Sequence, residues 1–149
     1  TSNNPLVDLE KYRSSYEGLQ ETERQAVVNS RIGQGKFRDD LIQYWGRCAV
    51  TGCTTERILR ASHIKPWSKA SNQERLDVHN GLLLVPNLDA AFDSGFISFD
   101  DDGKIMISRY LNEDDQIRLG IHPDLGISGL TEQHIKYLQY HREHIFKNE

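Results

Sequence analysis

Residues 62–93 constrain this chain more than any other stretch, because they carry chemically active side chains in a distinctive order. His63 comes first, Asn80 follows within an Asn-Gly pair, and Asp89 lies nine residues after the asparagine. Asp93 lies four residues beyond Asp89, so on a helix both carboxylates would point from one face. A base, an orienting amide and two hard oxygen ligands are the parts that a metal-assisted phosphodiester hydrolase requires.

The pattern around these residues predicts a strand, a loop, a second strand and a short helix. Residues 58–64 form a short, partly apolar run before Pro66, which predicts a strand with His63 near its end. Residues 68–79 are polar and have no period, so they predict a loop. The apolar run 81–85 predicts a second strand, and Asn87 is a suitable N-cap for a helix over 88–93 that Gly95 closes.

The flanking sequence predicts further elements. Gly33 and Gly35 are expected to break the chain before an amphipathic helix over 36–45. Residues 96–108, around an acidic turn, predict a β-hairpin, and 112–119 predict a short helix. Thr131 is expected to cap a longer C-terminal helix. Residues 1–30, with a weak helical stripe at Leu9, Tyr12, Tyr16 and Leu19, are expected to be a helical extension or a linker.

Composition indicates a soluble globular protein. The chain has 149 residues, of which 37% are hydrophobic and 27% charged. No apolar run approaches the roughly 20 residues that a membrane span needs, and residues 1–12 contain no apolar signal region. We therefore expect a cytoplasmic protein.

The charge is unevenly distributed. The net charge is −4, but residues 31–75 hold nine Lys or Arg against four Asp or Glu, a net of +5. Residues 76–149 hold six against thirteen, a net of −7, and residues 1–30 hold three against five, a net of −2. The basic excess lies before and around His63, where a phosphate backbone would approach. A solvated surface with chance asymmetry is the alternative.

The two cysteines, Cys48 and Cys53, do not form a zinc-binding pattern by themselves. Structural zinc sites use four ligands, commonly two C-x-x-C pairs, whereas here the spacing is C-x4-C without a second pair. We expect reduced thiols facing each other across a tight turn. A structural zinc module that uses these cysteines with distant histidines is a minor alternative.

Several motifs together resemble the HNH nuclease family: CAVTG, SHIKPW, NGLLL and FDSG, in this order, within a similarity over roughly residues 31–146. The resemblance implies a ββα-metal fold in which His63 activates water, Asn80 holds the connecting loop and orients the histidine, and Asp89 and Asp93 bind the metal. The chain departs from the family pattern at Asp89, where the family usually has histidine. It departs again at Ser62, where many members place a further ligand.

The predicted fold class is therefore α+β, a ββα-metal core with an added β-hairpin and flanking helices. We expect residues 31–149 to form the nuclease domain, of a subgroup similar to restriction-type HNH nucleases. The expected function is metal-dependent hydrolysis of DNA in restriction or antiphage defence. Because one such site cuts one strand at a time, a double-strand cut would need a homodimer or two successive nicks. A separate recognition or sensor domain is an expected partner.

The two aspartates favour a hard cation, Mg²⁺ or Mn²⁺. Candidate phosphate contacts are Arg60, Lys65, Lys69 and Arg38, for which a solvated edge or, at Arg38, a helix-capping role is the alternative. His79, His141 and Arg142 are further residues that could approach the site. His141 and Arg142 lie in a family-like segment, without an assigned role. The alternative function is a nucleic-acid-binding module that has kept the fold and lost the chemistry.

Overall fold

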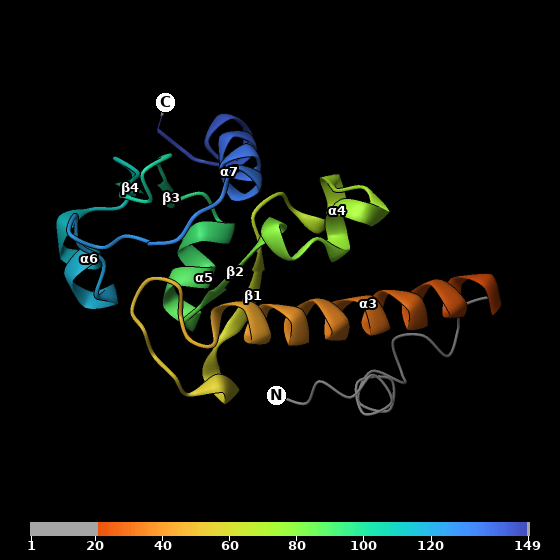
Figure 1. Cartoon of the computed structure of the whole chain (residues 1–149). Coiled ribbons are helices and arrows are strands. Elements are labelled where there is room, and N and C mark those ends of the chain that lie inside the picture. The colour runs from red at the N-terminus through yellow and green to blue at the C-terminus, as the bar shows by residue number, and fades with distance from the viewer. Residues whose placement is uncertain (1–20, 149) are drawn as a thin grey trace.

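The structure, a computed structural model, describes residues 21–148 (Figure 1). A long helix lies along one side of the molecule, a two-stranded sheet crosses its centre, and a second small sheet and two helices lie beyond it. The helices are α3 (Glu21–Trp45), α4 (Asn72–Leu76), α5 (Pro86–Asp93), α6 (Glu113–Leu119) and α7 (Glu132–His144), and the strands are β1 (Arg60–His63), β2 (Gly81–Leu84), β3 (Ile97–Phe99) and β4 (Ile105–Ile107).

Helix α3 is continuous over 25 residues, so the predicted break at Gly33 and Gly35 is wrong. Its buried side carries Phe37 and Leu41, spaced i, i+4, as the helical stripe predicts. At Gly33 an added Cβ would lie 3.6 Å from Leu76 and Trp67, an ordinary packing distance. A glycine in a helix costs only about 1 kcal/mol relative to alanine, and packing of the helix onto the sheet outweighs that cost.

The predicted extension over residues 1–30 is described only in part. Residues 1–20, which include the stripe from Leu9 to Leu19, lie outside the described residues. The rest of that segment belongs to α3, which crosses the expected domain boundary without interruption. The division of the chain into 1–30 and 31–149 stays a prediction.

Strands β1 and β2 form the antiparallel pair at the centre of the fold, as predicted. Their register places Ser62 opposite Leu82 and His63 opposite Gly81. All of β2 is buried, because α3 and α5 both pack against this sheet. His63 is the last residue of β1, where the sequence places it.

The connection between β1 and β2 is more ordered than the predicted loop. Helix α4 forms within it and begins with a capping box, in which Ser71 and Glu74 each bond the other's backbone N–H group. The Ser-x-x-Glu spacing is the sequence signal for this helix start. The helix was nevertheless not predicted, because residues 68–79 are polar and show no periodicity. Such a pattern results when, as in α4, no residue of the helix is buried.

Helix α5 starts earlier than predicted. Val85 is its N-cap residue and Pro86 occupies the first turn, so Asn87 is not the cap. The Asn87 amide instead donates a hydrogen bond to the Leu119 carbonyl of α6. Gly95 closes the helix as predicted, with a φ of 80°.

The remaining elements confirm the prediction. Strands β3 and β4 pair as a hairpin around the turn at Asp100. Asn112 caps α6, and Thr131 caps α7. The α+β class, with a β-β-α core, an added hairpin and flanking helices, is confirmed. None of the helices in residues 21–148 has the length and apolar character that a membrane crossing needs.

The two cysteines lie across a tight turn, as predicted. The Cys48 N–H group donates to the Cys53 carbonyl at 2.9 Å, and Gly52 N–H donates back to the Cys48 carbonyl at 3.0 Å. Both thiols are free, Cys48 in the core and Cys53 partly exposed. Across residues 21–148, no three His, Cys, Asp or Glu side chains cluster in a way that could hold a metal ion, either at the cysteines or at Asp89 and Asp93.

Candidate active site

His63 is held on three sides. Its Nε2 atom lies 2.8 Å from the Arg75 carbonyl oxygen. One face of the ring stacks on Phe37, with centroids 3.8 Å apart and planes 9° from parallel. Its edge meets Trp67 at a centroid distance of 5.5 Å. The ring position and plane are therefore defined by packing as well as by a hydrogen bond.

This hydrogen bond determines the tautomer of His63. A carbonyl oxygen only accepts, so Nε2 carries the hydrogen and Nδ1 keeps the lone pair of the neutral ring. Burial lowers the pKa of His63 below its ordinary value of 6.5. The Arg75 carbonyl opposes this shift, and the Arg75 charge adds to it. A neutral imidazole with a lone pair at Nδ1 is suited to accept a proton.

The Asn80 side chain forms hydrogen bonds with the backbone of Lys65 and of Glu74, both in the connection between β1 and β2. Its Oδ1 accepts from Lys65 N–H at 2.8 Å, and its Nδ2 donates to the carbonyls of Lys65 and Glu74 at 3.3 and 3.0 Å. The side chain is fully buried. Because Glu74 directly precedes Arg75, Asn80 also fixes the carbonyl that holds His63.

Asp89 and Asp93 lie on α5, which packs against β1. Asp89 is half-buried and Asp93 is exposed. Burial raises the pKa of the Asp89 carboxyl, a hydrogen bond with Ser62 lowers it, and the charge of Asp93 raises it again. The two carboxylates therefore repel each other, which a bound cation would relieve.

The donor set fits a hard divalent cation better than zinc. Two carboxylates are present without histidine or cysteine, and Mg²⁺ commonly uses one or two carboxylates together with water and substrate phosphate. Ser62 is occupied by its hydrogen bond to Asp89. The residues that would hold the ion are Asp89 and Asp93.

The histidine and the aspartates flank the end of β1 from different sides. Successive strand residues point to opposite faces, so the Ser62 hydroxyl meets α5 while the His63 ring meets α3. In the described part of the chain, no hydrogen bond joins His63 directly to either aspartate. The structure brings Ser62, Asp89 and Asp93 together on the α5 side of β1, whereas the His63 ring lies on the α3 side.

The four candidate phosphate contacts differ in the hydrogen bonds that their side chains already make within the protein. The Arg38 Nη atoms donate to the carbonyls of Leu59 and Glu56 at 2.6 and 2.8 Å, which secures the approach to β1. Lys65 pairs with both oxygens of Glu74 at 3.1 Å, and Lys69 is exposed. Arg60 has a buried Nη1 atom without a protein partner and interacts with the charge of Asp89.

His79, His141 and Arg142, the further residues expected to approach the site, make structural contacts. His141 is buried between the Ser98 hydroxyl and the Phe92 carbonyl, each at 2.8 Å, and burial lowers its pKa to about 4. Arg142 bonds the Phe99 carbonyl and Asp101. His79 pairs with Asp77 at 3.1 Å.

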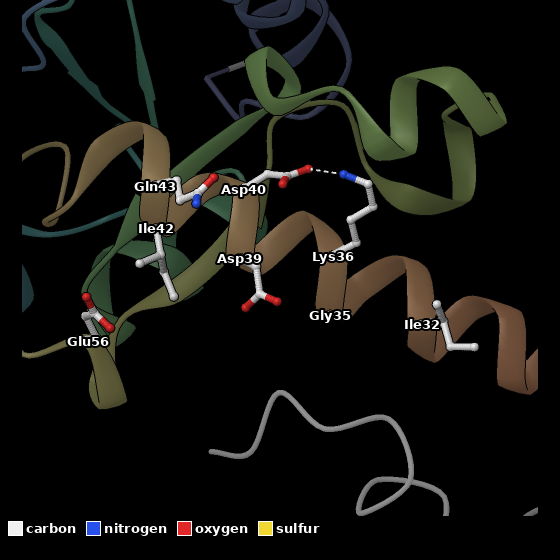
Figure 2. A pocket seen from close by; sticks show the side chains of 8 residues that line it. All are labelled: Ile32, Gly35, Lys36, Asp39, Asp40, Ile42, Gln43 and Glu56. Carbon is white, nitrogen blue, oxygen red and sulfur yellow. Dashed lines mark hydrogen bonds and ion pairs between the residues drawn. The ribbon is translucent and has the colours of Figure 1, made fainter.

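A separate hollow of about 670 Å³ runs along the outer side of α3 (Figure 2). Three of its lining side chains are carboxylates, at Asp39, Asp40 and Glu56, and Lys36 is paired with Asp40 at 2.7 Å. Its acidic lining is unsuited to a phosphate backbone. We therefore assign it no part in the candidate active site.

One comparison with known proteins found a match. Residues 48–100 match the model of the HNH endonuclease family, and this range contains His63, Asn80, Asp89 and Asp93. The central segment of the chain is therefore similar to the HNH endonuclease family. No curated protein matches the chain. The matched HNH segment excludes α3, so Phe37 reaches the site from outside it.

Two features of the candidate site were not predicted from the sequence. The stacking of Phe37 on His63 joins residues 26 positions apart, and nothing in the local pattern signals it. The Arg75 carbonyl is a backbone group inside a segment that was predicted to be a loop. The glycine at Gly81, directly opposite His63, was the available signal that another element approaches there.

Proposed function

We propose that this HNH protein is a metal-dependent endonuclease that hydrolyses phosphodiester bonds in DNA. The observation that carries the proposal is the state of His63, a stacked, neutral ring whose Nε2–H is held by a carbonyl and whose Nδ1 lone pair remains for a proton. In the proposed reaction His63 takes the proton from the attacking water at Nδ1. Asn80 maintains this geometry through the backbone of residues 65 and 74.

Asp89 and Asp93 are the proposed metal ligands, and Mg²⁺ or Mn²⁺ is the proposed ion. The carboxylate-only donor set and their mutual repulsion support this assignment. When bound, such an ion would neutralise charge on the scissile phosphate and assist the leaving 3′ oxygen. The protein's own contribution is to hold the two carboxylates on one helical turn beside the end of β1.

The proposed substrate contacts are the cations closest to this strand end. Arg60 is the strongest candidate for a phosphate contact, because its buried Nη1 lacks a protein partner beside Asp89. Lys69 is exposed and can interact electrostatically with the phosphate backbone of DNA. For Arg38 and Lys65, the bonds to carbonyls and to Glu74 favour a structural role.

Restriction or antiphage defence is the proposed biological context, and it rests on the resemblance of the motifs alone. A double-strand cut would then require two protomers or two successive nicks. A separate recognition or sensor domain would supply target selection, because the basic residues named here contact phosphates and carry no sequence information. A cytoplasmic location follows from that context.

A nucleic-acid-binding module without catalysis is the second candidate function. One observation favours it: Ser62 occupies a position where many HNH proteins have a ligand, which leaves two carboxylates for the metal. Binding of DNA without cleavage would distinguish this candidate.

The test is incubation of supercoiled plasmid with the protein and Mg²⁺ or Mn²⁺, beside EDTA and His63→Ala controls. We expect metal-dependent nicking that His63→Ala reduces by at least about 100-fold, the typical contribution of a positioned base. Asp89→Asn and Asp93→Asn should raise the metal concentration needed for half-maximal rate. His122→Gln is the control, because this histidine is exposed and lies outside the matched residues 48–100.

An intact plasmid under every metal, with folded protein that still binds DNA, would contradict the nuclease proposal. It would favour the binding module. Equal nicking by wild type and His63→Ala would assign the activity to a contaminant or to another base.

A further inference from the structure

The packing around His63 points to a role for α3 that the proposed reaction does not yet include. His63 and Gly81 are directly opposite each other in the β1–β2 pair. Side chains of directly opposed strand residues lie on the same face of a sheet. Gly81 has no side chain, so the space beside the His63 ring on that face is available to another residue.

Phe37 fills this space. A Cβ built on Gly81 would lie 2.4 Å from the Phe37 Cζ atom and 2.8 Å from a Leu41 methyl carbon, both far inside contact distance. Phe37 is 1% exposed and lies parallel to the His63 ring. The glycine therefore allows α3 to approach closely enough for the phenyl ring to cover one face of the imidazole.

The stacking and the hydrogen bond fix different degrees of freedom. The bond from Nε2–H to the Arg75 carbonyl defines the direction of one ring atom but permits rotation of the ring about that direction. A parallel neighbour at 3.8 Å prevents this rotation, because tilting the imidazole would bring it into the phenyl ring. Together, the hydrogen bond and the stacking restrict the Nδ1 lone pair of His63 to one direction.

We propose that Phe37 is a positioning residue for the general base, so that α3 belongs to the catalytic apparatus although it lies outside the HNH-matched segment. The inference rests on the proposed function of His63. It predicts that removing the phenyl ring reduces turnover more than substrate binding, because DNA contacts lie on other residues.

The test compares Phe37→Leu with Phe99→Leu in the plasmid-nicking assay. Phe99 is a fully buried phenylalanine of β3, so its substitution is a matched loss of core packing away from His63. We expect Phe37→Leu to lower kcat by about 10- to 100-fold with KM within about twofold, a typical cost of misplacing a reacting group. Phe99→Leu should change kcat by less than about threefold at a temperature where both variants are folded.

A second readout uses NMR and does not depend on activity. The His63 ring protons, assigned by comparison with His63→Gln, should resonate upfield of those of an exposed histidine because of the phenyl ring current. Phe37→Met, which keeps bulk and removes the phenyl ring, should reduce this shift to the contribution of Trp67 while leaving the His141 signals unchanged. This result would support the stacking even if the plasmid assay showed no nuclease.

Two results would overturn the inference. The first is equal loss of kcat in Phe37→Leu and Phe99→Leu, which would make Phe37 an ordinary core residue. The second is the absence of an upfield shift in the wild-type protein, which would mean that the two rings do not stack in solution.

Discussion

At the scale of single residues, burial and hydrogen bonding decide the chemistry of His63. Removing the ring from water disfavours the imidazolium form, while the Arg75 carbonyl fixes the tautomer. Neither contact involves a charged partner that would keep the ring protonated. The residue is therefore prepared to act as a base at a lower pH than an exposed histidine.

This state predicts the acid limb of the pH–rate profile. A general base must be unprotonated, and a lowered pKa keeps it unprotonated further into the acid range. We expect kcat/KM to fall as the pH decreases, with a midpoint below the ordinary histidine value of 6.5. Nicking rates in a buffer series at saturating Mg²⁺ measure this midpoint, and one above 6.5 would contradict the expectation.

At the scale of elements, two glycines lie at the interface of α3 with its neighbours, and they differ in the space available for a side chain. Gly33 lies within the helix and has ordinary space for a methyl group. Gly81 begins β2 and has none, because Phe37 and Leu41 occupy that volume. The sequence pattern treats both as flexible positions, but packing gives them different roles.

The two positions predict stability changes of opposite sign. Gly33→Ala should stabilise the protein by up to about 1 kcal/mol, because alanine is the better helix residue. Gly81→Ala should destabilise it by about 1–3 kcal/mol, because the methyl group overpacks the interface. Urea denaturation followed by circular dichroism measures both, and similar effects at the two sites would contradict the described packing of α3.

At the scale of the whole molecule, buried neutral histidines couple the fold to pH. His134 and His141 are both buried, and burial lowers the pKa of each to about 4. His141 connects the hairpin and α5 to α7, through Ser98 and the Phe92 carbonyl. Protonating it in place would charge a site without a counter-ion.

The expected result is loss of stability in mild acid. The unfolded chain takes up these protons near pH 6.5, whereas the folded chain resists until about pH 4. Stability is therefore complete above 6.5 and decreases progressively as the pH falls toward 4. Denaturation midpoints across this range should fall, with a shallower slope in His141→Gln, while an unchanged slope would exclude His141 as a cause.

The sequence by itself determined the local elements and the identity of the candidate site. Strong cap signals at Gly95 and Thr131 act within a few residues, so they are visible without the fold. The motifs around His63 and Asn80 likewise carried the HNH resemblance. Helix α4 and the start of α5 were misjudged, because their signals compete with a polar composition and with a proline at the helix start.

Only the tertiary structure decided how the site is held. The continuity of α3 through Gly33, the stacking of Phe37 on His63 and the Arg75 hydrogen bond all join segments distant in the chain. Arg38 likewise became a support for β1 through carbonyls about 20 positions away. Such contacts follow from the volume and burial available after the elements pack, which no local pattern encodes.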